Sequence, residues 1–196
     1  MSRFNAESRL LWAQTARELI GECYDYARPF IDKDYDGLDP FVRFVVAQLF
    51  IDCHLSSESA LILVGAGKEW DADILNRAVM EGSYKLLYML IGDASDLARK
   101  ANEYWNILPK LASVRRSERA KGVLEAVADP DSVHWRPLRE ALLADAEITA
   151  ARQGMNRSAR KSLEEQWSFA GISRFFSTSD IERMQLLAHM AHGYGY

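Results

Sequence analysis

The sequence predicts an all-α protein, and three observations lead to that prediction. Apolar residues recur at the spacing of three and four that helices require, and no segment shows a sustained alternation of apolar and polar residues. The chain has only five prolines, nearly all placed where a helix would begin or end. Its 196 residues, 48% of them hydrophobic, are enough to bury a core. We therefore expect a single helical domain over residues 1–196, a bundle of about seven to eight helices.

The first predicted helix runs from about residue 5 to 28. An acidic loop, "DKDYDGLDP", follows it and completes an N-terminal segment of residues 1–40, and the helical bundle occupies 41–196. The loop begins like a calcium-binding loop, but Arg43 stands where that loop needs its bidentate glutamate. An acidic turn between two helices is the simpler interpretation.

Two long helices are predicted next, over about 40–65 and 71–91. The "VGAGKEW" between them resembles a phosphate-binding loop at first sight. A Walker loop needs a hydroxyl side chain after its Gly-Lys pair, and Glu69 stands there instead. The glycines are therefore interpreted as the end of one helix, and the next begins at Asp71 or just before it.

The second half of the chain predicts a series of shorter helices. The last of them begins at Ser179, where "SDIE" forms a capping box with Glu182. The segment before it contains a break near Gly171. The predicted ranges, apart from the last helix, are 94–108, 109–128, 135–153 and 158–176.

Composition and charge narrow the class of protein. The net charge of −4 argues against a protein whose whole surface binds nucleic acid. The N-terminus lacks the apolar core of a signal peptide, and no stretch has eighteen or more uncharged apolar residues. The two cysteines do not make a disulfide scaffold. We expect a cytoplasmic protein that does not cross a membrane.

Two further groups of residues have a functional and a simpler interpretation. Cys23, Cys53 and His54 lack the spacing of a zinc site, so we expect no metal and no cofactor. The basic residues of "RRSERAK", together with Arg152 and those of the later "RSARK", would suit a phosphate-binding surface. Solvated helix faces explain these basic residues more simply.

The helix predicted over 71–91 carries one stripe of charge between two apolar sides. A surface ladder of salt bridges explains this stripe. Alternatively, Arg77 and Glu81 form a partly buried pair that lines a pocket. Gly82 and Ser83 would let another helix approach closely. The stripe consists of residues four apart: Glu69, Asp73, Arg77, Glu81 and Lys85.

At this helix the sequence resembles a known family. "SSESALILVGAGKEWDADILNRAVMEGSYKLLYML" is similar to the helical hairpin of a widespread bacterial domain of unknown function, with Arg77 and Glu81 matching its Arg-x3-Glu pair. "KSLEEQWSFAGISRFF" is similar to its Lys-Trp-Ser segment, and His192 lies in a matching C-terminal His-Gly helix. Met184 and Ala188 stand where that family has Tyr and Ser. The resemblance implies a HEPN-like helical bundle, and many HEPN proteins are ribonucleases or components of toxin and phage-defence systems.

The resemblance also implies a chemistry. HEPN nucleases place an Arg, four to six residues and then a His in a cleft shared by two domains, which implies RNA as substrate and a homodimer. RNA supplies its own 2′-hydroxyl nucleophile, so a His to move the proton and an Arg to hold the phosphate suffice without a metal. Arg183 and His189 fit that spacing, although an ideal helix separates them by about 120°. His192 is the better match to the resembled family.

We therefore predict a protein of a bacterial toxin, phage-defence or stress system that acts as a metal-independent RNA endonuclease. In this hypothesis Arg183 holds the phosphate, His189 or His192 is the acid or base, and Arg77 and Glu81 orient or line the site. A non-catalytic interaction module, such as an antitoxin or adaptor, is the alternative, and the missing Tyr and Ser favour it. A small-ligand sensor that uses the groove at Arg77 and Glu81 is a third possibility.

Overall fold

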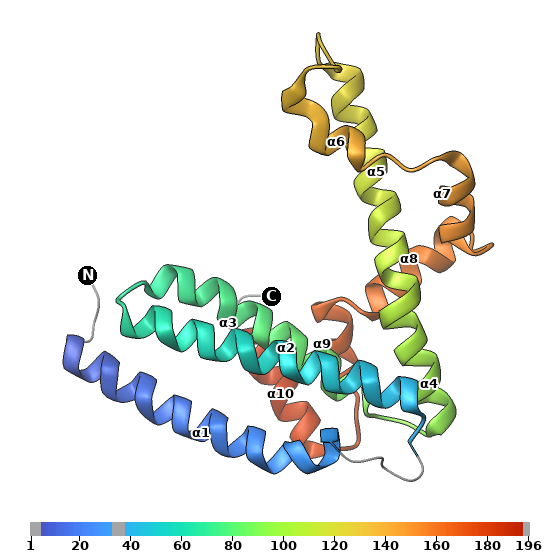
Figure 1. Ribbon diagram of the computed structural model, residues 1–196. Helices are drawn as coiled ribbons and strands as arrows, with labels where there is room; N and C mark the ends of the chain where they lie inside the picture. Colours follow the sequence, from blue (N-terminus) through green and yellow to red (C-terminus); the bar gives the residue numbers. More distant parts are fainter. Residues whose placement is uncertain (1–4, 33–37, 194–196) are drawn as a thin grey trace. The chain divides into compact units, whose positions relative to one another are not determined.

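The protein was analysed as a computed structural model, which describes residues 5–32 and 38–193. Every regular element in these ranges is helical, which confirms the all-α prediction (Figure 1). The chain divides into two compact units, Met1–Ala101 with Ile172–Tyr196, and Asn102–Gly171. The boundaries of these two units differ from those of the expected segments, 1–40 and 41–196. The folding of residues 1–196 as one domain stays a prediction.

The first unit is built on a long antiparallel hairpin of its first two helices. The Asp39 carboxylate caps the second helix by accepting hydrogen bonds from the amides of Phe41 and Val42, at 2.8 and 3.1 Å, and Pro40 starts that helix. The first helix extends further than expected, with Pro29 inside its last turn. The helices of this unit are α1 (Ala6–Asp32), α2 (Pro40–Gly65), α3 (Glu69–Met89), nearly all of α4 (Ala94–Asn102), most of α9 (Phe169–Ser177) and α10 (Glu182–Gly193).

Close packing of α2 against α3 forms the centre of the first unit. A Cβ added at Gly82 would lie 2.6 Å from the sulfur of Cys53, so this pair of helices approaches more closely than a larger residue would permit. The predicted close approach at Gly82 is thereby confirmed. Burial in the same contact raises the pKa of the Cys53 thiol. The buried residues of the two helices are Val42, Val45, Leu49, Ala60, Ala72, Tyr84, Tyr88 and Met89.

The turn from α3 to α4 contains a buried lysine. Lys100 is 4% exposed, and its Nζ donates hydrogen bonds to the carbonyls of Tyr88 and Ile91, at 2.8 and 2.6 Å. The ammonium also lies 4.2 Å from the centre of the Tyr88 ring. Asp93 caps α4 by accepting hydrogen bonds from the amides and side chain of the next turn, which lower its pKa. Lys100 therefore supplies positive charge at the C-terminal end of α3, where the exposed carbonyls of a helix favour it.

The second unit is built around one helix, α5 (Leu108–Ala126). A single π-helical turn, Glu103–Ile107, precedes α5, and the buried Trp167 donates a hydrogen bond of 2.9 Å from Nε1 to Glu103. The other helices of this unit are α6 (Arg136–Glu140), α7 (Asp145–Arg152) and α8 (Arg157–Gln166), with a short 3-10 turn at Val133–Trp135. Its core consists of Leu111, Val114, Ala120, Leu124, Ala151, Trp167 and Phe169.

Three of the expected boundaries differ from the structure. The predicted single helix over 135–153 is wrong, because the chain leaves helical geometry between α6 and α7. The amide of Leu143 donates to the hydroxyl of Ser117 at 2.9 Å, and the amide of Ala144 to the carboxylate of Glu147 at 2.7 Å. The expected break near Gly171 is found at Trp167 and Ser168. The last helix begins at Glu182, later than Ser179.

Helix α2 stands out by its composition. Among the residues that the structure describes, it is the one helix that is long and apolar enough to cross a membrane, with a mean hydropathy of 1.2 over its most apolar window. Only 17% of that window is buried within the protein. A helix of this composition is usually enclosed, so its exposed part needs an explanation.

Candidate functional site

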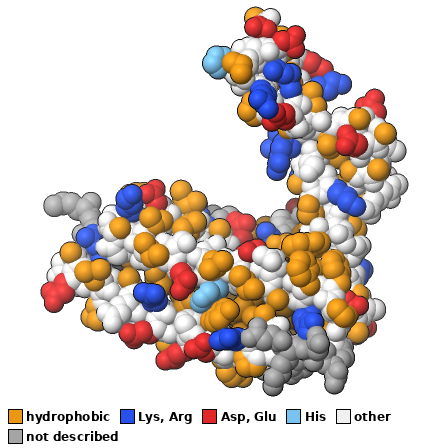
Figure 2. Space-filling model, viewed as in Figure 1, with side chains coloured by type: hydrophobic (Ala, Val, Ile, Leu, Met, Phe, Trp, Pro, Cys, Tyr) orange, Lys and Arg blue, Asp and Glu red, His pale blue; other side chains and the backbone are white. Residues whose placement is uncertain are grey.

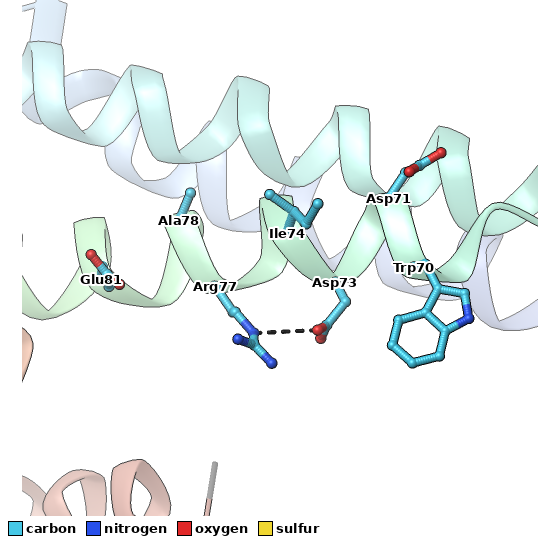
Figure 3. Close-up of a pocket in the computed structure, with 7 residues that line it drawn as sticks. All are labelled: Trp70, Asp71, Asp73, Ile74, Arg77, Ala78 and Glu81. Carbon is cyan, nitrogen blue, oxygen red and sulfur yellow. Dashed lines mark ion pairs between the residues drawn. The ribbon is translucent and has the colours of Figure 1, made fainter. Parts of the chain in front are cut away.

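The predicted site on α3 is an open groove (Figure 3). Its volume is about 570 Å³, and Arg77 and Glu81 both line it. The described residues of its wall all belong to α3: Trp70, Asp71, Asp73, Ile74, Arg77, Ala78 and Glu81. Pockets for small ligands enclose most of the ligand, and one helix face does not. The geometry therefore gives the small-ligand sensor little support.

The ion pair of Arg77 in this groove is with Asp73. The guanidinium Nε lies 3.3 Å from the carboxylate, and the two side chains are 59% and 51% exposed (Figure 3). Such a solvated pair one helical turn apart contributes about 0.3–0.5 kcal/mol. At the start of the same stripe, Glu69 pairs with Arg9 of α1 at 3.1 Å. These contacts agree with a surface ladder of charges along α3.

The predicted nuclease residues lie on α10, which packs against α3 within the first unit. The hydroxyl of Tyr84 donates a hydrogen bond to the carbonyl of Leu187, and burial raises the pKa of that phenol. Ala188 follows and is 1% exposed, so it is a small residue of the core. The hydrogen bond of Tyr84 joins the backbone of α10 to α3.

The side chains of the proposed catalytic group are described only in part. His189 is exposed on α10, where a ligand in solvent can reach it. The backbones of Arg183 and His192 belong to α10, but their side chains lie outside the described residues. The group of Arg183, His189 and His192 therefore stays a prediction.

A basic groove lies on α5 of the second unit. It has a volume of about 350 Å³, and its wall consists of Ala112, Arg115, Arg116, Arg119, Ala120, Val123 and Leu138. Arg115 pairs with Glu164 of α8 at 2.6 Å. Arg116 and Arg119 are exposed and form no ion pair within the described ranges. The described "RRSERAK" cluster is thus a largely solvated helix face, as the simpler interpretation expects.

A groove between α1 and α2 was not expected from the sequence. Its volume is about 870 Å³. Apolar and small residues form most of its wall, and three charged residues, Arg17, Glu18 and Glu58, lie along it. The remaining wall residues are Leu10, Ala13, Gln14, Gly21, Leu61, Ile62 and Gly65. The sequence "LLW", residues 10–12, could have predicted exposed apolar side chains on this helix, because three consecutive apolar residues of a helix cannot all face one core.

Exposed apolar residues continue beyond this groove. Ile62 is 71% exposed and Trp70 is 89% exposed, and Leu10, Leu11, Trp12, Leu19, Phe44, Leu55 and Ile74 are also exposed. Hydrophobic side chains are visible between the charged ones over the surface of this unit (Figure 2). Within the described ranges, no three His, Cys, Asp or Glu side chains are placed to hold a metal ion.

The fold and the surface define an all-α protein with an open groove between α1 and α2, and most of the wall of this groove is apolar or small residues. Comparison with known protein families, with curated proteins and with solved structures finds no match to this chain. The HEPN-like resemblance therefore stays a prediction.

Proposed function

We propose that this chain is a helical interaction module that binds another protein surface through the exposed apolar residues of α1, α2 and α3. One observation carries the proposal: only 17% of the most apolar window of α2 is buried, and Phe44, Leu55 and Ile62 of this helix are 48%, 54% and 71% exposed. Each large aliphatic side chain that a partner covers contributes about 1.5–3 kcal/mol. Contiguous apolar patches on a soluble protein usually mark an interaction site for that reason.

The pattern of charge around the α1–α2 groove supports the same proposal. Protein interfaces commonly combine an apolar centre with a polar rim that sets the register of the partner. Here Leu10, Leu61 and Ile62 supply the apolar part, while Arg17, Glu18 and Glu58 supply charges of both signs. An antitoxin or an adaptor, which acts by covering another protein, needs a surface of this kind.

A photo-crosslinking experiment tests this proposal. We expect benzoylphenylalanine in place of Ile62 to form a crosslink to a protein when the cells that naturally make this chain are irradiated. The same group in place of the exposed Lys121 of the second unit is the matched control and should form none. Absence of any crosslink from Ile62, with the variant folded, would show that this face has no partner.

A ribonuclease is a second proposal, and the exposure of His189 on α10 favours it. An imidazole at the surface can reach the 2′-hydroxyl of an RNA chain and accept its proton. The docking of α10 through Tyr84 would hold that imidazole at a fixed place on the unit.

Cleavage of end-labelled structured RNA in EDTA measures this second activity. We expect His189→Ala to lower the rate about 10²–10⁴-fold, the usual contribution of a general acid or base. The exposed His134 in the second unit provides the control, and His134→Ala should cleave at the unchanged rate. Equal cleavage by all three proteins, or none by the unaltered chain, would contradict the ribonuclease proposal.

A further inference from the structure

We propose that the basic groove on α5 binds an acidic amphipathic helix of a partner protein. This groove belongs to the second unit, so the inference goes beyond the proposed function and is independent of the α1–α2 groove. A chain with both surfaces would join two proteins, as an adaptor does. Three features of the groove lead to this occupant: the spacing of its wall along α5, the sign of its charges and the apolar residues at its ends.

The wall of the groove contains a row of four side chains on one face of α5, here called the α5 seam. The four residues follow one another at intervals of four, three and four positions, and they lie within about 60° of one another around the helix. Helices that pack lengthwise against another helix show this spacing. The seam is about 16 Å long, so it matches a helix of about three turns. It consists of Ala112, Arg116, Arg119 and Val123.

The charged residues of the described wall all have the same sign: Arg115, Arg116 and Arg119. Arg115 is paired with Glu164 of α8 at 2.6 Å. The two arginines of the seam, Arg116 and Arg119, are exposed and form no ion pair within the described ranges, so both are available to a partner. A guanidinium binds a carboxylate through two parallel hydrogen bonds, and for that reason acidic side chains are the partners that suit this pair.

The two ends of the α5 seam are apolar. Val123 at one end is 42% exposed, and Leu138 of α6 lines the same groove. Ala112 at the other end is small. An occupant therefore needs apolar side chains over both ends and two carboxylates between them. Side chains three residues apart are neighbours on a helix, so a single helix can supply both carboxylates.

Two other occupants fit the groove less well. The α5 seam has the same pattern in both directions, apolar, basic, basic, apolar, so a second copy of it would bring arginine against arginine in either orientation. A nucleic acid is held by a broad positive surface and by aromatic side chains that stack on its bases. The described wall contains no aromatic side chain, and residues 102–171 carry eleven Lys and Arg against ten Asp and Glu.

Fluorescence anisotropy of a labelled peptide with the purified full chain tests the groove. The probe is an alanine-rich helical peptide of about 15 residues that carries Leu, Glu, Glu and Leu on one face, at the intervals of the α5 seam. We expect Arg116→Glu and Arg119→Glu each to weaken its binding at least about 10-fold, because like charges then face each other. Arg157→Glu makes the same change of charge at an exposed position of α8 and should leave the binding unchanged. Far-ultraviolet circular dichroism should be the same for all these proteins.

Exchange of the charges separates a specific contact from a general effect of net charge. A peptide with Lys in place of both Glu should bind the double variant of Arg116→Glu and Arg119→Glu, and it should bind the unaltered chain at least about 10-fold more weakly than the Glu peptide does. Net charge alone predicts the opposite preference, because the unaltered chain carries −4. A peptide of the same composition with the two Glu on the opposite face from the two Leu should bind neither protein.

Photo-crosslinking in the cells that make this chain identifies the natural occupant. Benzoylphenylalanine in place of Val123 should crosslink to a protein segment that contains two acidic residues three positions apart, and the combined Arg116→Glu and Arg119→Glu changes should abolish that crosslink. Lys121, the control position for Ile62, lies about 180° around α5 from Ala112 and should form none. Because Val123 and Ile62 belong to different units, one position can crosslink without the other, so the two proposals fail separately.

Three results would overturn the acidic helix. The first is no binding of the Glu peptide at about 1 mM, the weakest affinity of a specific contact. The second is binding that Arg116→Glu and Arg119→Glu leave unchanged. The third is displacement of the Glu peptide by structured RNA at a concentration lower than that of the unlabelled peptide, which would assign the groove to a nucleic acid.

Discussion

Replacement of Gly171 by alanine is expected to destabilise the second unit by about 3 kcal/mol, at the upper end of the usual cost of an added methyl group in a packed region. A Cβ at this position would lie 1.9 Å from the carbonyl oxygen of Glu165, a backbone atom. A flexible side chain could turn away from such a contact, whereas the carbonyl cannot move without its helix. The backbone between α8 and α9 would therefore have to open.

Hydrogen bonds resist that opening. Ser168 donates from its hydroxyl to the carbonyl of Glu165 at 2.7 Å and accepts from the amide of Gly171 at 2.9 Å. Its hydroxyl thus joins the end of α8 to the first turn of α9. Trp167, immediately before it, is buried and bound to Glu103. A shift of this corner breaks these contacts, so the structure has no inexpensive way to relax.

Urea unfolding monitored by circular dichroism measures the effect of Gly171→Ala. The matched control is Gly122→Ala on α5, where an added Cβ meets nothing within 4 Å. That substitution should stabilise the unit by about 0.5–1 kcal/mol, because alanine loses less backbone entropy in a helix. Equal effects of the two substitutions would show that the corner at Ser168 is looser than the structure indicates.

Replacement of Lys100 by methionine is expected to destabilise the first unit by about 2–4 kcal/mol. Methionine has nearly the same length and apolar stem, so the substitution removes the ammonium without leaving a large cavity. The carbonyls of Tyr88 and Ile91 would lose their hydrogen bonds to Nζ in a place that is closed to water. The attraction of the ammonium to the Tyr88 ring would also be lost.

The lysine experiment has its own control and its own local measurement. Lys110 is exposed on α5, and Lys110→Met should change the free energy of unfolding by less than about 0.5 kcal/mol. Hydrogen exchange should become faster in α3 and α4 of Lys100→Met, because the cation links the end of one to the body of the other. Unchanged stability of Lys100→Met would mean that the cost of burying the charge offsets its hydrogen bonds.

Much of the first unit could be predicted from the sequence. The range 40–65 and the start of the next helix were predicted because glycine and proline end helices by local geometry, whatever the fold. The close approach at Gly82 was predicted because an absent side chain is visible in the sequence. The sequence could not predict which carboxylate pairs with Arg77, because Asp73 and Glu81 each lie one turn away on the same stripe. In the structure the partner is Asp73.

The predicted helix over 135–153 is wrong for a physical reason that lies elsewhere in the chain. Its break depends on the hydroxyl of Ser117, which accepts the amide of Leu143 from 26 positions earlier. No local pattern at 141–144 contains that partner. The buried position of Lys100 was equally hidden, because a lysine is ordinarily assigned to the solvent unless backbone carbonyls are known to face it.

The sequence by itself determined that this protein is helical, because the spacing of apolar residues and the few prolines act over one or two turns. Only the tertiary structure decided which apolar residues are covered. Periodicity places Trp12, Leu19 and Ile62 on helices, but whether a helix faces a core or the solvent depends on contacts between segments far apart in the chain. Here those contacts leave the α1–α2 groove open to solvent, with Leu10 and Ile62 exposed along it.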